Sequence, residues 1–218
     1  MTLITTKYPS PPESPAVKSS CYGGSFLFPY HWTPLPFSRI FYVLLMAKLV
    51  PENHPALHTM AEEVTPEEFA DGTVAKIVKD LRAAIKTYDV DGYAAVAIAA
   101  PQIGVSKRIF ITQDESKDRE DRLPSLVAIN PRFTKTSKKM QEMGEGCLSI
   151  PDTYGIVARH KNVTMEATDE DGNLYSRGAG GLFSTILQHE YDHLDGILFP
   201  ERALEVWTKG NEPEGYEN

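Results

Sequence analysis

The chain has 218 residues, which is enough for one domain with a buried core or for two small domains. Its hydrophobic content of 41% and charged content of 24% are those of an ordinary globular protein. The net charge of −8 argues against broad binding of nucleic acid, so any contact with RNA must be local.

Cysteine content and hydropathy argue against two further classes. Cys21 and Cys147 stand in unlike surroundings, which disfavours a disulfide framework and favours a reducing compartment. No segment approaches the roughly 18 apolar residues of a membrane span. The nearest, IFYVLLMA between Arg39 and Lys48, is too short, and it lies too far from the N-terminus for a secretory signal.

Residues 1–45 differ in amino-acid composition from the rest of the chain. YPSPPESPAVKSS is rich in proline and serine, and FLFPYHWTPLPF interleaves aromatic residues with prolines, which neither a helix nor a strand tolerates. Three interpretations stay open: a disordered extension, an organellar targeting segment, or sequence upstream of a true start at Met46. We therefore expect an extension over 1–45, a folded domain over 46–205 and an acidic tail over 206–218.

The first regular element is a helix that begins at TPEE. Thr65 offers an N-cap, Pro66 suits the first helical position, and Glu68 completes a capping box. Apolar residues then recur at the spacing of one helical face: Val74, Ile77, Val78, Leu81, Ile85 and Tyr88. The pattern predicts one amphipathic helix that ends at about Tyr88.

Strand patterns follow this helix. After the small apolar segment YAAVAIAAPQIG at 93–104, KRIFITQ (107–113) and SLVAINP (125–131) each favour a strand, with a charged loop between them. Residues 155–181 alternate in polarity and carry Asp-Gly at 171–172, which is typical of a hairpin turn.

A last apolar helix is expected from about Gly181 to Leu194, and it contains the sequence QHEYDHLDG. His189 and His193 lie one turn apart on one face, so both imidazoles can reach one cation. Glu190 projects about 100° around the helix, beside the ion, where its carboxylate can take a proton from water. Two solvated surface histidines are a weaker interpretation, because GGLFSTILQ before them is apolar.

The order of these elements predicts the fold class. We expect an α+β fold, with antiparallel β-sheets surrounding a central metal-binding helix and with a second helix near the start of the domain.

A catalytic site of this kind needs a third protein ligand and one open position. Metzincin-type proteases place the third ligand, a histidine, six residues after the second, but that position here is Phe199, which cannot bind a metal. Thermolysin-like proteases use a glutamate on a later helix. Glu201 or Glu205 would be that glutamate, but little chain remains to build the helix. Cys147 in GEGCLSIP is the better candidate, because glycines let the backbone approach and a cation holds the thiol as thiolate. A lone cysteine is more often a small buried hydrophobe, but the neighbouring histidine motif reverses that preference.

Three motifs resemble the signatures of the peptide deformylase family. They are AAPQIG (99–104), EGCLS (145–149) and QHEYDHLDG (188–196), in the usual order and spacing, and the resemblance covers about residues 47–200. It implies an enzyme that removes the formyl group from the N-terminal formylmethionine of newly synthesised proteins. It also implies one metal ion per chain, usually Fe(II), with zinc, nickel or cobalt as alternatives.

The resemblance assigns roles to individual residues. The metal ligands would be Cys147, His189 and His193. Glu190 would carry the proton, and the Gln102 amide and the Leu148 backbone N–H would stabilise the oxyanion. Substrate-binding residues would be Val96, Ala97, Ile98 and Gly146, with the first motif pairing to the peptide like an added strand. Thr185 and Ile186, which helix geometry puts on the face of His189, would line the pocket, although plain core packing is an equal alternative.

The chain departs from the family pattern around the first motif: the family carries glycine where this chain has Ala95 and Ala97, just before AAPQIG. A methyl group there narrows the pocket or, if the backbone needs a positive φ, strains it. The departure puts catalytic efficiency in doubt rather than the reaction class.

Two other functions stay open: another metallopeptidase with the same helix motif, and a catalytically weak deformylase-like protein that binds formylated peptides. The expected partners are nascent formylmethionyl polypeptides, with a transient ribosome contact and neither a membrane nor stable nucleic-acid binding. The expected location is the cytoplasm, or an organelle if residues 1–45 are a targeting segment.

Overall fold

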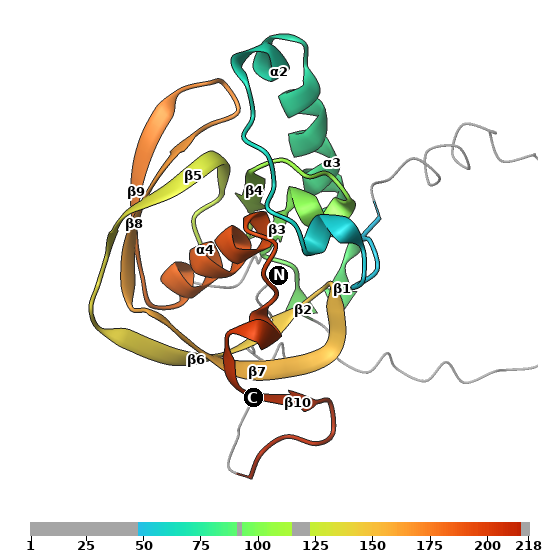
Figure 1. The fold of residues 1–218 in the computed structure, drawn as a ribbon, viewed down its shortest axis with the longest axis vertical. Helices are drawn as coiled ribbons and strands as arrows, with labels where there is room; N and C mark the ends of the chain where they lie inside the picture. Colours follow the sequence, from blue (N-terminus) through green and yellow to red (C-terminus); the bar gives the residue numbers. More distant parts are fainter. Residues whose placement is uncertain (1–47, 91–92, 115–122, 215–218) are drawn as a thin grey trace, which may run out of the picture. The chain divides into compact units, whose positions relative to one another are not determined.

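The computed structural model describes residues 48–90, 93–114 and 123–214, so the interpretations of residues 1–45 and Met46 lie outside the described part of the chain. Its strands pair antiparallel in three sheets, with orders β3-β4-β5-β8-β9, β10-β7-β6 and β1-β2 (Figure 1). The strands are β1 Asp89–Val90, β2 Tyr93–Ala94, β3 Ala97–Ala99, β4 Ile109–Thr112, β5 Leu126–Thr136, β6 Met140–Cys147, β7 Ile150–His160, β8 Asn162–Thr168, β9 Leu174–Gly180 and β10 Ala203–Thr208. The expected α+β class with antiparallel sheets is confirmed.

The first predicted helix is divided in two, α2 Pro66–Ala70 and α3 Thr73–Thr87. The Glu68 carboxylate accepts a hydrogen bond from the Thr65 backbone N–H at 2.9 Å, as a capping box requires. Gly72 adopts a φ of +86°, which breaks the helix before its apolar face begins. The expectation of one continuous helix was therefore wrong at this glycine.

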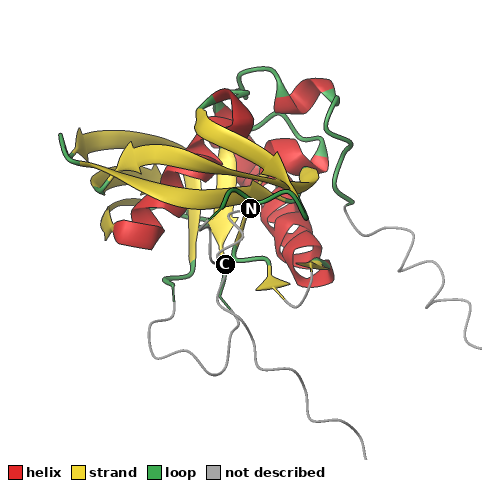
Figure 2. Ribbon diagram, turned by 90° about the horizontal axis from the view of Figure 1, so that it is seen from below, coloured by secondary structure: helices red, strands yellow, loops and turns green. Residues whose placement is uncertain are grey.

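The five-stranded sheet has a helix on each face, because successive strand residues point to opposite sides. Ile109, Ile111 and Ile129 pack with α3, whereas Phe110 and Ala128 pack with α4 (Gly181–Leu194). In Figure 2 the strands form curved yellow sheets with the red helices against them. Both faces of this sheet are therefore buried against a helix.

Helix α4 has the bounds that the sequence predicts, and it contacts strands of both larger sheets, β3, β4, β8 and β9 of one and β7 of the other. It ends where Gly196 adopts a φ of +73°. A Cβ at Gly196 would lie 2.6 Å from the backbone nitrogen of Thr59. Glycine in QHEYDHLDG is therefore required by the turn and by the close approach of another segment.

The three-stranded sheet closes the other side of α4. After α4 come the 3-10 helix η3 (Phe199–Glu201) and β10, whose Trp207 is buried. A Cβ at Gly155 of β7 would lie 2.6 Å from the Glu205 carbonyl oxygen, so glycine lets β10 lie close. β10 thus crosses the expected boundary at residue 205, and that division stays a prediction. Among the described helices, none has the length and apolar character needed to span a membrane.

Candidate metal centre

Three buried side chains from β6 and α4 converge on one point. The Sγ of Cys147 and the ring nitrogens of His189 and His193 lie within 4.8 Å of one another. Cys147 Sγ is 3.4 Å from His193 Nε2, and the two imidazole rings are 5.0 Å apart at an angle of 79°. A thiolate and two imidazoles at this separation form a donor set suited to one transition-metal ion.

The end of β6 aims Cys147 at the helix. The register with β7 shifts between Gly146 and Cys147, so that Cys147 pairs with Ile150 while Gly146 pairs with Tyr154. An irregularity of this kind turns a side chain out of the regular pleat, and such irregularities are frequent next to active sites.

A buried carboxylate orients His189. Glu145 Oε2 lies 2.8 Å from His189 Nδ1, and Arg159 Nε lies 2.8 Å from Glu145 Oε1. With its Nδ1–H donated to Glu145, His189 keeps Nε2 for a metal. Arg159 also binds Asp192 of α4, so one buried guanidinium joins two carboxylates.

The electrostatics of these groups favour ligation. Burial raises the pKa of the Cys147 thiol, but the charges and hydrogen bonds around it, including those of His193 and His189, outweigh burial and lower the pKa well below its ordinary value. Burial also raises the pKa of Glu145, but hydrogen bonds from His189 and Arg159 outweigh it and lower the pKa to about 2. Glu145 is therefore ionised at neutral pH, and the surroundings of Cys147 favour its thiolate form.

Gln102, in the 3-10 helix η2 (Ala100–Ile103), points its amide nitrogen at the site. Its Oε1 accepts a hydrogen bond from the Ala99 N–H at 2.9 Å, which fixes Nε2 at 3.7 Å from Cys147 Sγ and 3.2 Å from Ser149 Oγ. Leu148 follows Cys147 directly, and its side chain packs in the core on the α3 side. Glu190 is fully buried on α4 between the two histidines in sequence.

The expected substrate-binding residues fall into two groups. Val96, Ala97 and Ile186 form one small apolar cluster, with Thr185 fully buried beside Ile186 in α4. The side chain of Ile98 instead packs in the core under α3, because it points to the opposite face of β3. Gly146 lies in β6 next to Cys147.

Two residues beside Thr185 were not expected at the site. Gln141 Nε2 donates to Thr185 Oγ1 at 3.0 Å, and Thr185 Oγ1 donates to Met143 Sδ at 3.3 Å. Both come from β6, so this strand supplies one wall of the space in front of α4.

Glu145, Arg159 and Asp192 were also missed. Glu145 has a sequence signal, because it stands in the EGCLS motif, two residues before Cys147. Asp192 has a weaker one, since it lies three residues after His189 on the helix. Arg159 has none: only the pairing of β7 with β6 brings it to the site.

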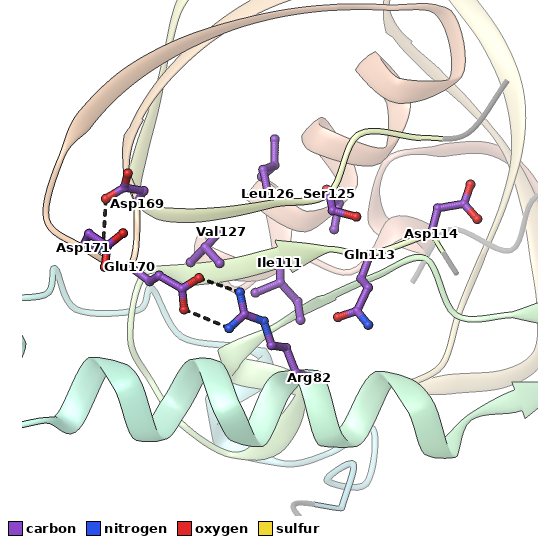
Figure 3. A pocket seen from close by; sticks show the side chains of 11 residues that line it. Arg82, Ile111, Gln113, Asp114, Ser125, Leu126, Val127, Asp169, Glu170 and Asp171 are labelled. Carbon is purple, nitrogen blue, oxygen red and sulfur yellow. Dashed lines mark hydrogen bonds and ion pairs between the residues drawn. The ribbon is translucent and has the colours of Figure 1, made fainter. Parts of the chain in front are cut away.

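A separate pocket of about 450 Å³ lies beside α3 and contains none of these residues. Arg82 of α3 forms two hydrogen bonds with Glu170, at 2.8 and 2.6 Å, and Ile111 and Val127 also line this pocket (Figure 3). Asp169 accepts hydrogen bonds from Asp171 N–H and Asn173 N–H, so the polar side chains there hold the β8–β9 turn. This pocket does not belong to the candidate metal centre.

Comparison with known proteins gives a consistent result. The model of the polypeptide deformylase family matches residues 46–207. A peptide deformylase of Chromohalobacter salexigens is 39% identical over 154 residues, which is 71% of this chain and 85% of that protein. A chloroplastic peptide deformylase 1A of Solanum lycopersicum is 32% identical over 72% of this chain and 59% of its own length.

A solved structure agrees in fold. The structure of a peptide deformylase from Acinetobacter baumannii with Met-Ala-Ser bound is 30% identical and has a TM-score of 0.64. The match covers 71% of this chain and 96% of that one.

Proposed function

Because the chain belongs to the polypeptide deformylase family and is an enzyme that removes the formyl group from N-terminal formylmethionine, we propose that Cys147, His189 and His193 hold its metal ion. The family is metal-dependent, and the donor set fits a divalent transition metal. One sulfur and two nitrogen ligands leave a position open for water. We propose Fe(II) as the native ion, with zinc, nickel or cobalt able to occupy the same ligands.

The bound metal supplies the Lewis acidity that makes a water molecule nucleophilic near neutral pH. The protein supplies the proton transfers. Glu190 takes the proton of the attacking water on its carboxylate and returns it to the methionine nitrogen as the C–N bond breaks. Formate and a free α-amine are the products, so one carboxylate serves both steps.

Two donors stabilise the charge that develops on the formyl oxygen. The Gln102 Nε2 and the backbone N–H of Leu148 take this role. The hydrogen bond from Ala99 N–H to Gln102 Oε1 supports the assignment, because it holds the amide so that its nitrogen, a donor, faces the site. Such preorganised donors cost no rearrangement during the reaction.

The peptide binds along β3. Among the described residues this strand is the first in the order of its sheet and pairs with β4 on one side, so its other side offers backbone groups to an added strand. We assign that contact to Val96, Ala97 and Ile98, with Gly146 facing from β6. Thr185 and Ile186 line the space for the methionine side chain.

One observation carries this proposal: the buried approach of Cys147, His189 and His193 within 4.8 Å in a chain of this family. The test is formate release from formyl-Met-Ala-Ser by anaerobically purified protein, with its metal measured in parallel. We expect turnover with about one metal per chain and a marked loss of metal in Cys147→Ala. A fully loaded Cys147→Ala variant would return the third ligand to Glu201 or Glu205.

Two other outcomes would replace the proposed activity. Cleavage of internal peptide bonds in a fluorescent peptide panel would identify a metallopeptidase. Binding of formylated peptides without formate release would identify a weak deformylase-like binder, and Ala95 and Ala97 motivate that alternative. Neither outcome would change the assignment of the three ligands.

We further propose that nascent formylated polypeptides are the substrates, with a transient ribosome contact and no stable nucleic-acid binding. The division into an extension over 1–45, a catalytic domain over 46–205 and an acidic tail over 206–218 stays a prediction. So does the cytoplasmic location, for which an organelle is the alternative if residues 1–45 are a targeting segment.

A further inference from the structure

The segment after α4, from Phe199 to Arg202, packs against the proposed metal ligand His189 and its neighbour Asp192. The Phe199 ring of η3 stacks on His189, with centroids 6.3 Å apart and an interplanar angle of 22°. Three residues later, Arg202 Nε donates to Asp192 Oδ2 at 2.7 Å. One short segment therefore contacts α4 twice, once at a proposed ligand and once at an aspartate three residues after it.

Arg202 is the outer end of a chain of ionic contacts that ends at a ligand. Asp192 Oδ2 accepts from both Arg202 and Arg159. Arg159 uses its other edge on Glu145, with Nε at 2.8 Å and Nη2 at 3.0 Å from the two carboxylate oxygens. Glu145 Oε2 then lies 2.8 Å from His189 Nδ1.

The geometry of Arg159 couples the two ends of this chain. A guanidinium is planar and rigid, so the direction of Nη1 toward Asp192 fixes the directions of Nε and Nη2 toward Glu145. If the Asp192 carboxylate turns, Arg159 turns with it, and the acceptor of His189 moves. The position of Asp192 thus bears on the orientation of the His189 ring.

Arg202 differs from the inner members in its exposure. Its side chain is 44% exposed, against 8% for Asp192 and 4% for Arg159. It borders a pocket of about 280 Å³ together with Asp192 and Arg159. Arg202 is therefore the member that can be changed with least disturbance of the buried core.

We propose that Arg202 is a positioning residue of the metal centre, which acts through Asp192, Arg159 and Glu145 to hold His189 with its Nε2 toward the ion. The inference rests on the proposed metal site. It assigns a role in ligation to a surface residue that follows the metal-binding motif and touches no ligand. It also explains why Asp192 is buried between two arginines.

The test compares Arg202→Ala and Arg202→Lys with the wild type after loading with zinc. The first measurement is the rate at which zinc is lost to an excess of chelator. Direct partners of ligands typically change metal affinity by roughly 10- to 100-fold. For this more distant residue we expect release to be faster by roughly 3- to 10-fold in Arg202→Ala, with partial recovery in Arg202→Lys, which keeps the charge and one donor.

The second measurement is the NMR signal of the His189 Nδ1 proton in the zinc-loaded protein. We expect this signal to shift and to exchange faster with water in Arg202→Ala. A role of Arg202 limited to holding η3 and β10 would lower the melting temperature without moving this signal.

Two controls complete the design. Arg132→Ala removes the same charge from another arginine, which pairs with Glu63 at 3.1 Å. Val206→Ala weakens β10 away from the contact chain. Release rates in Arg202→Ala equal to either control would overturn the inference, whereas a wild type that takes up no zinc at these ligands would instead overturn the proposed metal site.

Discussion

The two helices that cover the five-stranded sheet differ in the polarity of the residues that they bury. The inner face of α3 is apolar throughout, with buried Val74, Ile77, Val78, Leu81, Ala84 and Ile85. Helix α4 buries Phe183, Ile186 and Leu187, but also Ser184, Thr185, Gln188, His189, Glu190, Asp192 and His193. Burying polar groups costs free energy unless they find partners, so α3 serves stability and α4 serves chemistry.

The partners of α4 come from distant strands. Glu145 of β6 meets His189, Arg159 of β7 meets Asp192, and Gln188 Nε2 donates to the His160 carbonyl oxygen at 2.9 Å. The polar face is therefore held by the three-stranded sheet, whereas the face of α3 needs only apolar contact. Substitutions on the two helices should separate activity from stability.

The largest expected effect is on activity alone. Glu190→Gln keeps the shape of the side chain but cannot accept a proton, so turnover should fall by roughly 100-fold or more. Metal content should stay that of the wild type. Formate release and metal analysis on the same preparation check both points, and near-full activity would remove Glu190 from the mechanism.

Glu145→Gln should lower the stability of the metal-free protein by about 3–5 kcal/mol at neutral pH, because it leaves Arg159 buried with one carboxylate fewer. The effect should depend on pH. The pKa of Glu145 is lowered from 4.5 to about 2, so its ionised form stabilises the fold above about pH 4.5, and this contribution is lost as the pH falls toward 2.

Urea unfolding at several pH values checks the Glu145 prediction. The difference between wild type and Glu145→Gln should be largest above about pH 5 and should shrink steadily toward pH 3. A difference that is constant over this range would mean that the ion pair with Arg159 is not what stabilises the fold.

On the other face of the five-stranded sheet, in α3, Leu81→Ala should lower the free energy of unfolding by about 2–5 kcal/mol, because the Leu81 side chain is fully buried. Metal content and kcat/KM of the folded protein should not change. Lys79→Ala, at an exposed position of the same helix, is the control and should stay within about 0.5 kcal/mol of wild type. A loss of metal in Leu81→Ala would show that the two helices are not independent.

The smallest effects concern the alanines of the first motif. Neither Ala95 nor Ala97 has a positive φ, so alanine fits without strain and each change to glycine should cost about 0.5–1 kcal/mol. Ala95 packs in the core under α3, whereas Ala97 contacts the cluster of Ile186. We expect Ala97→Gly to change kcat/KM for formyl-Met peptides and Ala95→Gly to change stability only.

Unfolding and kinetics on the two single variants test this division. Unchanged kinetics in Ala97→Gly would show that the departure from the family pattern carries no functional meaning. Altered kinetics in Ala95→Gly alone would place the narrow point of the pocket nearer to α3.

The sequence by itself determined what local rules control. The apolar segment GGLFSTILQ and the histidine motif after it located α4, and the spacing of His189 and His193 placed both on one face before any strand was considered. Alternation and an Asp-Gly turn located the β8–β9 hairpin. The motif around Cys147 pointed to a third ligand only in combination with the histidine helix, because a lone cysteine is more often a small buried hydrophobe.

Only the tertiary structure decided what lies between elements distant in the chain. The pairing of β6 with β7 brings Arg159 to Glu145, and the return of the chain after α4 brings Arg202 to Asp192; no periodicity in the sequence encodes those contacts. The same is true of Ile98, whose side chain faces α3 because the sheet has a helix on each side. Local propensity acts over one or two turns, whereas ion pairs and sheet faces depend on how whole strands register.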